Sequence, residues 1–319
     1  MNKPLLCCVA LVATAVTWPI TVYAQTTTNA SRAPAATKAR PEAQRIFATP
    51  EQAAAELANA IRSNDLTHIH SVLGPGSGKV IRSGDPVQDA AGRKRFLEAY
   101  ETSVKVEASG DARATLLIGL EEFPFPFPLV KLTTGWKFDS KAGAEEVLDR
   151  RIGRNERSAI QVCLAYVDAQ REYATKDRDK DGLLEYAHKF ISTPGEHDGL
   201  YWETREGEAA SPLGPLSTRA KEQGYNVGTQ PYHGYYYKIL TAQGADNPGG
   251  AYSYIVRGKM IGGFALVAFP ARWGASGVMT FICNHQGVVY EKNLGKDTVA
   301  VAERMTRYNP DASWKKSDQ

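Results

Sequence analysis

Residues 158–173 read SAIQVCLAYVDAQREY, and this segment sets the architecture of the second half of the chain. Ile160, Cys163 and Val167 recur at helical spacing, with Leu164 beside them, and form one apolar stripe. An amphipathic helix buries such a stripe against another layer of secondary structure. Four segments with strand composition follow the helix and can provide that layer: residues 235–240, 264–270, 278–283 and 288–292. The sequence therefore predicts a long helix packed on an antiparallel sheet.

The spacing of the cysteines extends this expectation. Met279, Phe281 and Cys283 share one face of a strand, and residues 284–287 (NHQG) have the composition of a hairpin turn. If that face meets the helical stripe, Cys283 approaches Cys163. In an oxidising compartment the two cysteines could form a disulfide, and the alternative is a pair of buried free thiols.

The first half of the chain shows helices followed by strands. Thr49-Pro50-Glu51 has the composition of a helix start, and further helices are expected over residues 66–73 and 89–100. Strands are expected over residues 103–108, 112–120, 125–133 and 135–138, the third starting as an edge or loop because of its prolines. This order predicts an α+β fold with helices on one face of an antiparallel sheet.

The N-terminus has the pattern of a cleavable signal peptide. Lys3 precedes the apolar residues 5–16, and Val22-Tyr23-Ala24 supplies small residues at the cleavage positions. Residues 25–45 lack an apolar period and are predicted to be a disordered linker. We therefore expect a signal peptide at 1–24, the linker at 25–45, and domains at 46–150 and 151–319. Cleavage near Ala24 predicts a periplasmic or secreted protein, peripheral at most to the membrane.

Charge excludes one class of partner. The 319 residues contain 38 Lys+Arg and 35 Asp+Glu, without the basic excess that nucleic-acid binding usually requires.

Residues 177–182 (DRDKDG) place three carboxylates, Asp177, Asp179 and Asp181, at the spacing of a calcium loop, with Glu185 four residues later. His188 stands where a bidentate Glu belongs. Calcium is the single cofactor that the sequence suggests, and a solvated turn is the alternative.

Aromatic residues suggest a binding surface. Four tyrosines, Tyr232, Tyr235, Tyr236 and Tyr237, fall within six residues and could stack on a glycan or a partner protein of the envelope. Ordinary strand propensity explains the same pattern.

No familiar catalytic signature is present, so no catalytic residue is assigned and an enzyme is the less favoured interpretation. A hydrolase using His197 or His233 with a nearby carboxylate is the alternative.

Three resemblances add to this reading. Residues 46–150, with the motif GWKFD at 135–139, resemble the NTF2-like (cystatin-like) domains, which implies a scaffold or binding role. Residues 154–173, 235–240 and 277–290 together resemble the globular half of type IV pilins and pseudopilins. The motifs YHGYY at 232–236, DGLYW at 198–202 and IGGFALVA at 261–268 are similar to those of the exported bacterial domain of unknown function 2950. The last of these resemblances implies location and domain pattern, and no activity.

The sequence thus predicts an exported, non-enzymatic binding or assembly-accessory module of the cell envelope. The alternatives are the periplasmic hydrolase and a calcium-stabilised structural component.

Overall fold

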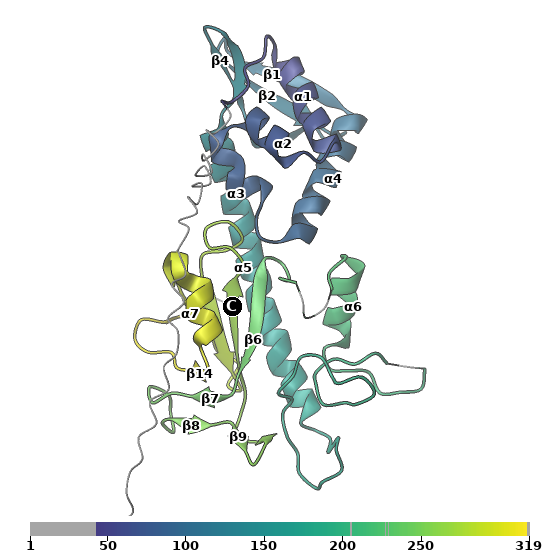
Figure 1. The fold of residues 1–319 in the computed structure, drawn as a ribbon, viewed down its shortest axis with the longest axis vertical. Helices are drawn as coiled ribbons and strands as arrows, with labels where there is room; N and C mark the ends of the chain where they lie inside the picture. Colours follow the sequence, from purple (N-terminus) through teal and green to yellow (C-terminus); the bar gives the residue numbers. More distant parts are fainter. Residues whose placement is uncertain (1–42, 205, 227, 229, 318–319) are drawn as a thin grey trace, which may run out of the picture. The chain divides into compact units, whose positions relative to one another are not determined.

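The computed structural model describes residues 43–204, 206–226, 228 and 230–317. The expected signal peptide, and nearly all of the expected linker, lie outside these residues. The described chain combines helices with antiparallel sheets, which confirms the α+β class (Figure 1). Within the described ranges, every helix is too short or too polar to cross a bilayer.

The N-terminal helices begin at side chains that cap them. Thr49 Oγ1 accepts a hydrogen bond from Gln52 N at 3.2 Å, and Asp65 and Asp85 cap the next long helices in the same manner. These caps confirm the helix starts that the sequence indicated near residues 49 and 66. The helices are α1 (Pro50–Arg62), α2 (Leu66–Leu73), the short η1 (Pro75–Ser77) and α3 (Gly78–Ile81), and α4 (Pro86–Thr102).

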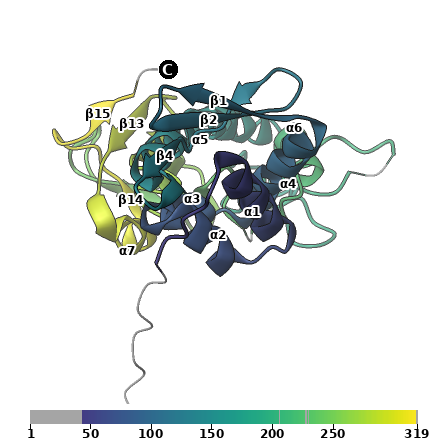
Figure 2. The same cartoon turned by 90° about the horizontal axis from the view of Figure 1, so that it is seen from above.

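The first sheet follows α4 and has strand order β1-β2-β4-β5, with β3 paired to β2. Its strands are β1 (Val104–Ser109), β2 (Arg113–Ile118), β3 (Phe123–Pro124), β4 (Leu129–Leu132) and β5 (Gly135–Phe138). Figure 2 shows α1, α2 and α4 on one side of β1 and β2. Leu57, Leu116 and Phe138 are fully buried between these layers.

Prolines shape the middle of this sheet. Residues 125–128 (FPFP) lie outside the strands, and the ladder resumes at Leu129. Pro126 and Pro128 have no N–H to donate to a neighbouring strand, so this segment lies where a ladder is not required.

Helix α5 (Ser140–Tyr173) is 34 residues long and begins about fifteen residues before the predicted start, with Asp139 as its N-cap. It passes without a break through the expected boundary at residue 150. In its first half Gly143 and Ala144 are buried, and Val147 packs against the core of the N-terminal part. Polar contacts add to this packing. Arg151 donates hydrogen bonds to the carbonyl oxygens of Lys79 at 2.9 Å and Val80 at 2.7 Å. The end of α3 thereby fixes this part of α5.

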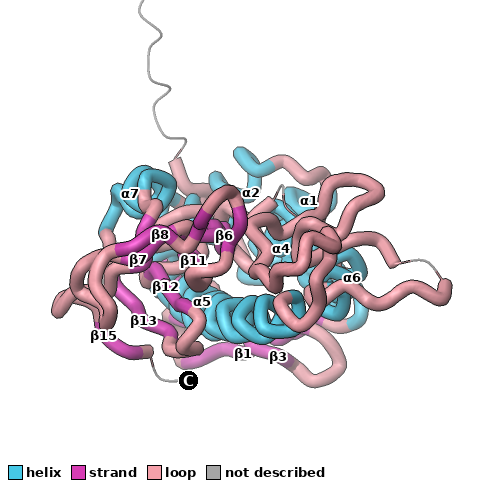
Figure 3. Tube along the Cα trace, turned by 90° about the horizontal axis from the view of Figure 1, so that it is seen from below, coloured by secondary structure: helices cyan, strands magenta, loops and turns pink. Residues whose placement is uncertain are grey.

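The second sheet has strand order β15-β13-β12-β11-β6, all antiparallel. Its strands are β6 (Tyr235–Leu240), β11 (Ala265–Pro270), β12 (Thr280–Asn284), β13 (Val289–Lys292) and β15 (Lys315–Lys316). The second half of α5 packs on β11 and β12, and Figure 3 shows it beside these strands. The expected helix-on-sheet packing is therefore observed, with Cys163, Tyr166, Leu266 and Phe281 buried in the interface.

Shorter elements complete the C-terminal part. They are α6 (Gly214–Glu222), β7 (Ala242–Gln243), β8 (Tyr252–Ser253), β9 (Ile255–Val256), β10 (Lys259–Met260), η2 (Gly295–Asp297), α7 (Thr298–Arg304) and β14 (Arg307–Tyr308). The predicted turn at 284–287 is confirmed, with Gly287 N donating to Asn284 O at 2.8 Å. Helix α6 is not among the elements that the sequence predicted.

Polar side chains of α5 fix the loop before β12. Asn155 Nδ2 donates to Ser276 O at 2.9 Å, and Glu156 Oε1 accepts from the backbone N–H groups of Val278 and Met279, both at 2.9 Å. Asn155 is buried, and a buried amide without a partner is costly. These contacts set the register at which the sheet meets the helix.

Candidate binding site

A tight turn at residues 232–235 leads into β6. Tyr232 and Tyr235 exchange backbone hydrogen bonds at 2.9 and 3.1 Å, while His233 and Gly234 have φ angles of 49° and 76°. Two successive positive φ angles are the geometry of a two-residue hairpin turn. A Cβ on Gly234 would lie 2.6 Å from Asn155 Nδ2, so glycine is required at this position.

This turn separates the four predicted surface tyrosines. Tyr235 is fully buried, and its hydroxyl donates to Met279 O at 2.9 Å, so its inclusion in a binding surface is wrong. Tyr232, Tyr236 and Tyr237 line a common cavity. Strand alternation would put Tyr236 and Tyr237 on opposite faces. Because β6 is an edge strand, side chains from both faces can reach the cavity beside that edge.

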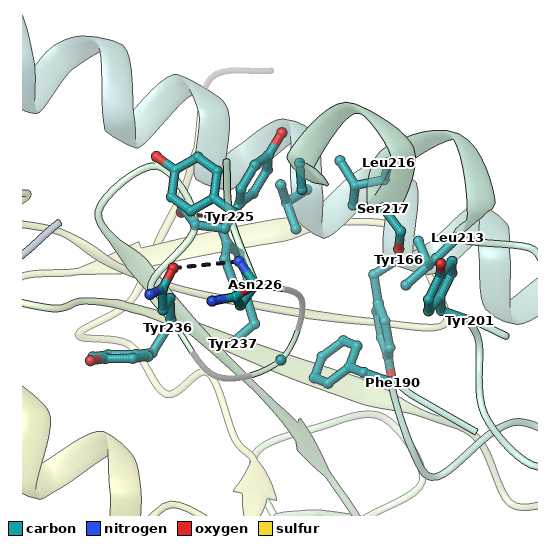
Figure 4. Close-up of a pocket in the computed structure, with 15 residues that line it drawn as sticks. Tyr166, Phe190, Tyr201, Leu213, Leu216, Ser217, Tyr225, Asn226, Tyr236 and Tyr237 are labelled. Carbon is teal, nitrogen blue, oxygen red and sulfur yellow. Dashed lines mark hydrogen bonds between the residues drawn. The ribbon is translucent and has the colours of Figure 1, made fainter. Parts of the chain in front are cut away.

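The cavity, here called the aromatic pocket, has a volume of about 150 Å³ (Figure 4). None of the side chains around it is charged. They come from α5, the segment after it, α6 with its N-cap, the loop before β6, and β6 itself: Val162, Tyr166, Phe190, Tyr201, Leu213, Leu216, Ser217, Ala220, Tyr225, Asn226, Gly228, Gln230, Tyr232, Tyr236 and Tyr237.

The wall formed by α6 was not predicted from the sequence. Leu213, Leu216, Ser217 and Ala220 are spaced three or four residues apart, which is helical periodicity. Pro215 lies in the first turn of the helix, where proline is favoured. This signal is short, and glycines and prolines lie around it.

Most tyrosine hydroxyls around the aromatic pocket are already engaged. Tyr166 Oη donates to Ala265 O at 3.2 Å and accepts from Gln170 Nε2 at 3.0 Å. Burial raises the pKa of Tyr166 well above its ordinary value, so this hydroxyl stays neutral. Tyr201 Oη accepts from Lys221 Nζ at 2.7 Å. With their hydroxyls held elsewhere, these residues present mainly ring surface to the cavity.

A second cavity, here called the acidic pocket, adjoins the first and has a volume of about 950 Å³. Tyr201, Tyr225 and Asn226 line both cavities. The other walls are largely polar and include Glu196, His197, Glu203, Glu208 and Lys221. Lys221 lies 3.1 Å from Glu203 Oε1, so these two side chains form an ion pair on this wall.

The predicted calcium residues do come together. Carboxylate oxygens of Asp177, Asp179 and Asp181 lie within 4.8 Å of one another. However, Lys259 Nζ, from β10, contacts Asp179 and lies 2.6 Å from Asp181 Oδ2 and 3.4 Å from Glu185 Oε1. These contacts raise the pKa of Lys259. An ammonium group therefore occupies the place among the carboxylates where the sequence suggested a cation.

Asp177 has a different role from its neighbours. Its two carboxylate oxygens accept hydrogen bonds from Lys180 N and Gly182 N, both at 2.8 Å. These are contacts of a turn-forming aspartate.

The two cysteines lie side by side as expected. Cys283 Sγ is 3.7 Å from Cys163 O, and both residues are fully buried as free thiols. The hydrogen bond to Cys163 and burial raise the pKa of Cys283.

The histidines proposed for a hydrolase do not lie together. His197 stacks on Trp202 with ring centroids 4.4 Å apart and lines the acidic pocket. His233 lies in the hairpin turn, 3.2 Å from Gln88 Nε2 through its Nδ1, and burial lowers its pKa. Among the described residues, the one histidine that hydrogen-bonds a carboxylate is His68, with Glu56 at 2.9 Å on the surface of α1 and α2.

Comparison with known proteins identifies the family of this chain but no individual relative. No curated protein and no solved structure matches it. The model of one family matches residues 44–317, which include all but one of the described residues. The chain therefore belongs to the family described as "Protein of unknown function (DUF2950)".

Proposed function

We propose that this protein is an exported cell-envelope protein that binds a small ligand through the aromatic pocket. The observation that carries the proposal is the uncharged cavity of about 150 Å³ between α5, α6 and the edge of β6. An apolar cavity of this size accommodates a single six-membered aromatic ring. Concave apolar sites with few polar groups are the usual form of small-molecule sites.

The shape of the site favours an inserted group over a flat partner. Tyr232 and Tyr237 line a cavity, with Tyr237 Oη 3.4 Å from Tyr232 O. A glycan that stacks on an open aromatic platform needs ring faces on an exposed surface, and Tyr236 is the most exposed of these rings, at 39%. We therefore place the ligand's apolar group inside the cavity.

Binding of phenethyl alcohol, measured by calorimetry, tests the proposal. Leu216→Trp fills the cavity from α6 and is expected to abolish binding. Tyr236→Ala removes one wall and is expected to weaken binding about fivefold, since an aromatic contact contributes about 1 kcal/mol. Tyr252→Ala is the matched control, because Tyr252 is 38% exposed and lies outside the pocket. Equal binding by all three variants would contradict the proposal.

Export is tested separately. The pattern of Lys3, residues 5–16 and Ala24 supports cleavage after Ala24. Mass spectrometry of the mature protein from the cell envelope or medium should find an N-terminus at Gln25. Material that retains Met1 would refute the export step and leave the binding proposal intact.

A further inference from the structure

A separate cavity, here called the N-terminal cavity, lies inside the first core. Its volume is about 200 Å³, and its walls come from α1, α2, α3, α4, the first half of α5 and the segment between β3 and β4. Ile69, Phe96 and Phe127 line it and are buried. Protein interiors contain few voids larger than a water molecule, so an opening of this size in a core requires an explanation. An apolar cavity of about 150 Å³ already accommodates a benzene ring.

Gly92 forms part of the wall of this cavity, in the middle of α4. Glycine in the interior of a helix is less favourable than alanine, because it loses more conformational freedom on folding. Close packing does not require the glycine here, since Arg95 Nη2, the nearest atom beyond the local backbone, lies 4.0 Å from the position of a Cβ. The glycine therefore lowers stability and leaves the wall of the cavity open.

Three charged side chains line the cavity: Asp89 and Arg93 from α4, and Arg151 from α5. All three are half-buried, whereas the apolar walls are buried, so the mouth of the cavity lies at this charged end. Asp85 and Arg154 act on Arg151 from outside the lining, with opposite signs. The mouth therefore carries two guanidinium groups and one carboxylate.

The carboxylate and one of the guanidinium groups are already engaged. Asp89 accepts a backbone hydrogen bond at 2.9 Å, and burial raises the pKa of its carboxyl group. Arg151 donates its two hydrogen bonds to carbonyl oxygens of the protein.

Arg93 is the side chain at the mouth that can hold a ligand. It follows Asp89 by four residues, the spacing at which opposite charges on a helix pair. Within the described ranges, however, no side chain or carbonyl forms an ion pair or a hydrogen bond with Arg93, although its charge acts on Asp89. Glu98 and Glu101 line a neighbouring surface hollow with Arg93, and they pair with other basic side chains at 3.7 and 2.9 Å.

We infer that the N-terminal cavity binds an anionic amphiphile, an organic acid whose short apolar chain lies in the cavity and whose carboxylate pairs with Arg93 at the mouth. Guanidinium and carboxylate form strong, directional hydrogen bonds. No residue lines both this cavity and the aromatic pocket, so the inference goes beyond the proposed function and does not depend on it.

Three six-carbon probes test the inference by calorimetry at neutral pH: hexanoate (anionic), hexan-1-ol (neutral) and hexylamine (cationic). Hexanoate is expected to bind about tenfold more tightly than hexan-1-ol, and hexylamine more weakly than both. Added salt should reduce the advantage of hexanoate, since it screens exposed charges. Leu216→Trp, which fills the aromatic pocket, should bind hexanoate as the wild type does.

A charge variant tests the role of Arg93. Arg93→Gln is expected to remove the advantage of hexanoate while leaving the affinity for hexan-1-ol within about twofold. Arg95→Gln is the matched control, because Arg95 is an exposed arginine of the same helix and does not line the cavity. Binding of hexan-1-ol also verifies that each variant retains a folded cavity.

A glycine variant tests the position of the apolar chain. Gly92→Ala should raise the melting temperature by about 2–3 °C and weaken hexanoate binding severalfold, because the added methyl group takes up space at the cavity wall. Gly153→Ala is its control, since Gly153 is exposed in α5 and lies outside the cavity. It should raise the melting temperature similarly without changing the affinity.

The outcomes distinguish this inference from the proposed function. Equal affinity for hexanoate and hexan-1-ol, or an advantage of hexanoate that persists in Arg93→Gln, would overturn the anionic ligand. Hexanoate binding that is lost in Leu216→Trp but unchanged in Gly92→Ala would place the acid in the aromatic pocket and overturn the second site. Failure of hexanoate to bind the wild type would also overturn it, while the test of the aromatic pocket with phenethyl alcohol would stand.

Discussion

The carboxylate of Asp85 and the hydroxyl of Tyr225 form a buried hydrogen bond of 2.8 Å between residues 140 positions apart. Asp85 Oδ1 caps α4 by accepting from Gln88 N at 3.0 Å, while Oδ2 accepts from Tyr225 and, at 2.8 Å, from Gly234 N. Tyr225 lines both cavities. One side chain of the N-terminal part therefore holds a wall of the candidate site and the turn before β6.

Asp85→Ala should destabilise the protein more than a typical lost cap. A surface N-cap contributes about 1 kcal/mol, and hydrogen bonds to a charged group contribute roughly 1.5–3 kcal/mol. We expect a loss of roughly 3 kcal/mol in the free energy of unfolding, measured with urea. Asp65→Ala is the control, because Asp65 caps α2 from an exposed position and should cost about 1 kcal/mol. Similar losses in the two variants would show that the contact with Tyr225 contributes little.

Alkaline pH should destabilise the fold through Tyr173. Burial and the nearby Glu185 raise the pKa of Tyr173 to about 12 from 10.0, and its hydroxyl donates to His197 O at 2.8 Å. Since the folded-state pKa is the higher one, the stabilisation is complete below about pH 10 and is lost as the pH rises through about 12. The expected loss is roughly 2 kcal/mol. Thermal denaturation of the wild type and of Tyr173→Phe between these pH values checks it, and parallel curves would argue against this origin.

Acid should destabilise the loop at Asp198. Partial burial raises the pKa of this carboxyl, but hydrogen bonds from Lys189 and Thr193 outweigh it and lower the pKa to about 2 from 3.8. Because the folded-state pKa is the lower one, the stabilisation is present above about pH 4 and is lost as the pH falls toward 2. Asp198→Asn should therefore flatten the acid limb of the melting-temperature curve. A limb that is as steep in the variant as in the wild type would locate the acid sensitivity elsewhere.

Calcium and Lys259 should compete for the same carboxylates. Lys259→Met removes the ammonium group from Asp179, Asp181 and Glu185, so the variant should melt at a lower temperature. Added calcium should raise the melting temperature of the variant more than that of the wild type, with EDTA reversing the effect. Lys238→Met is a suitable control, because Lys238 donates to backbone carbonyls away from this loop. No calcium response in either protein would remove the loop from consideration as a cation site.

The Cys163–Cys283 pair should oxidise during export. Two thiols lose two hydrogens to a disulfide oxidant such as oxidised glutathione, which is reduced to two thiols. Because 120 residues separate the cysteines, the crosslink is expected to contribute about 4–5 kcal/mol in the chain-entropy model. Thiol titration in denaturant should find no free thiol in protein from an oxidising compartment. Two titratable thiols in that material would refute the disulfide.

Local signals were sufficient for many elements of the fold. Thr49, with proline after it, marked the start of α1, and NHQG at residues 284–287 marked the hairpin between β12 and β13. These signals act over a few residues, through caps and turns. The first half of α5 was not predicted, because its contacts are made to segments far away in the chain: Val147 packs on the first core, and Arg151 bonds the α3 carbonyls.

The candidate site depended on contacts that no local pattern encodes. Tyr236 and Tyr237 alternate along a strand, and it is the edge position of β6 that lets both reach one cavity. Lys259 enters the acidic loop from 80 residues away and contacts Asp179, one of the carboxylates at which the sequence predicted a cation.

The amino-acid sequence alone determined the α+β class and the pairing of the α5 stripe with an antiparallel sheet, because periodicity and turn chemistry are short-range properties of the chain. The family followed from the resemblance of its motifs. The tertiary structure decided which tyrosines face a cavity, which charges are already paired, and how Asp85 holds the loop that carries Tyr225. The reason is physical: a pocket is formed by segments far apart in the chain, and its shape and charge exist only after those segments pack together.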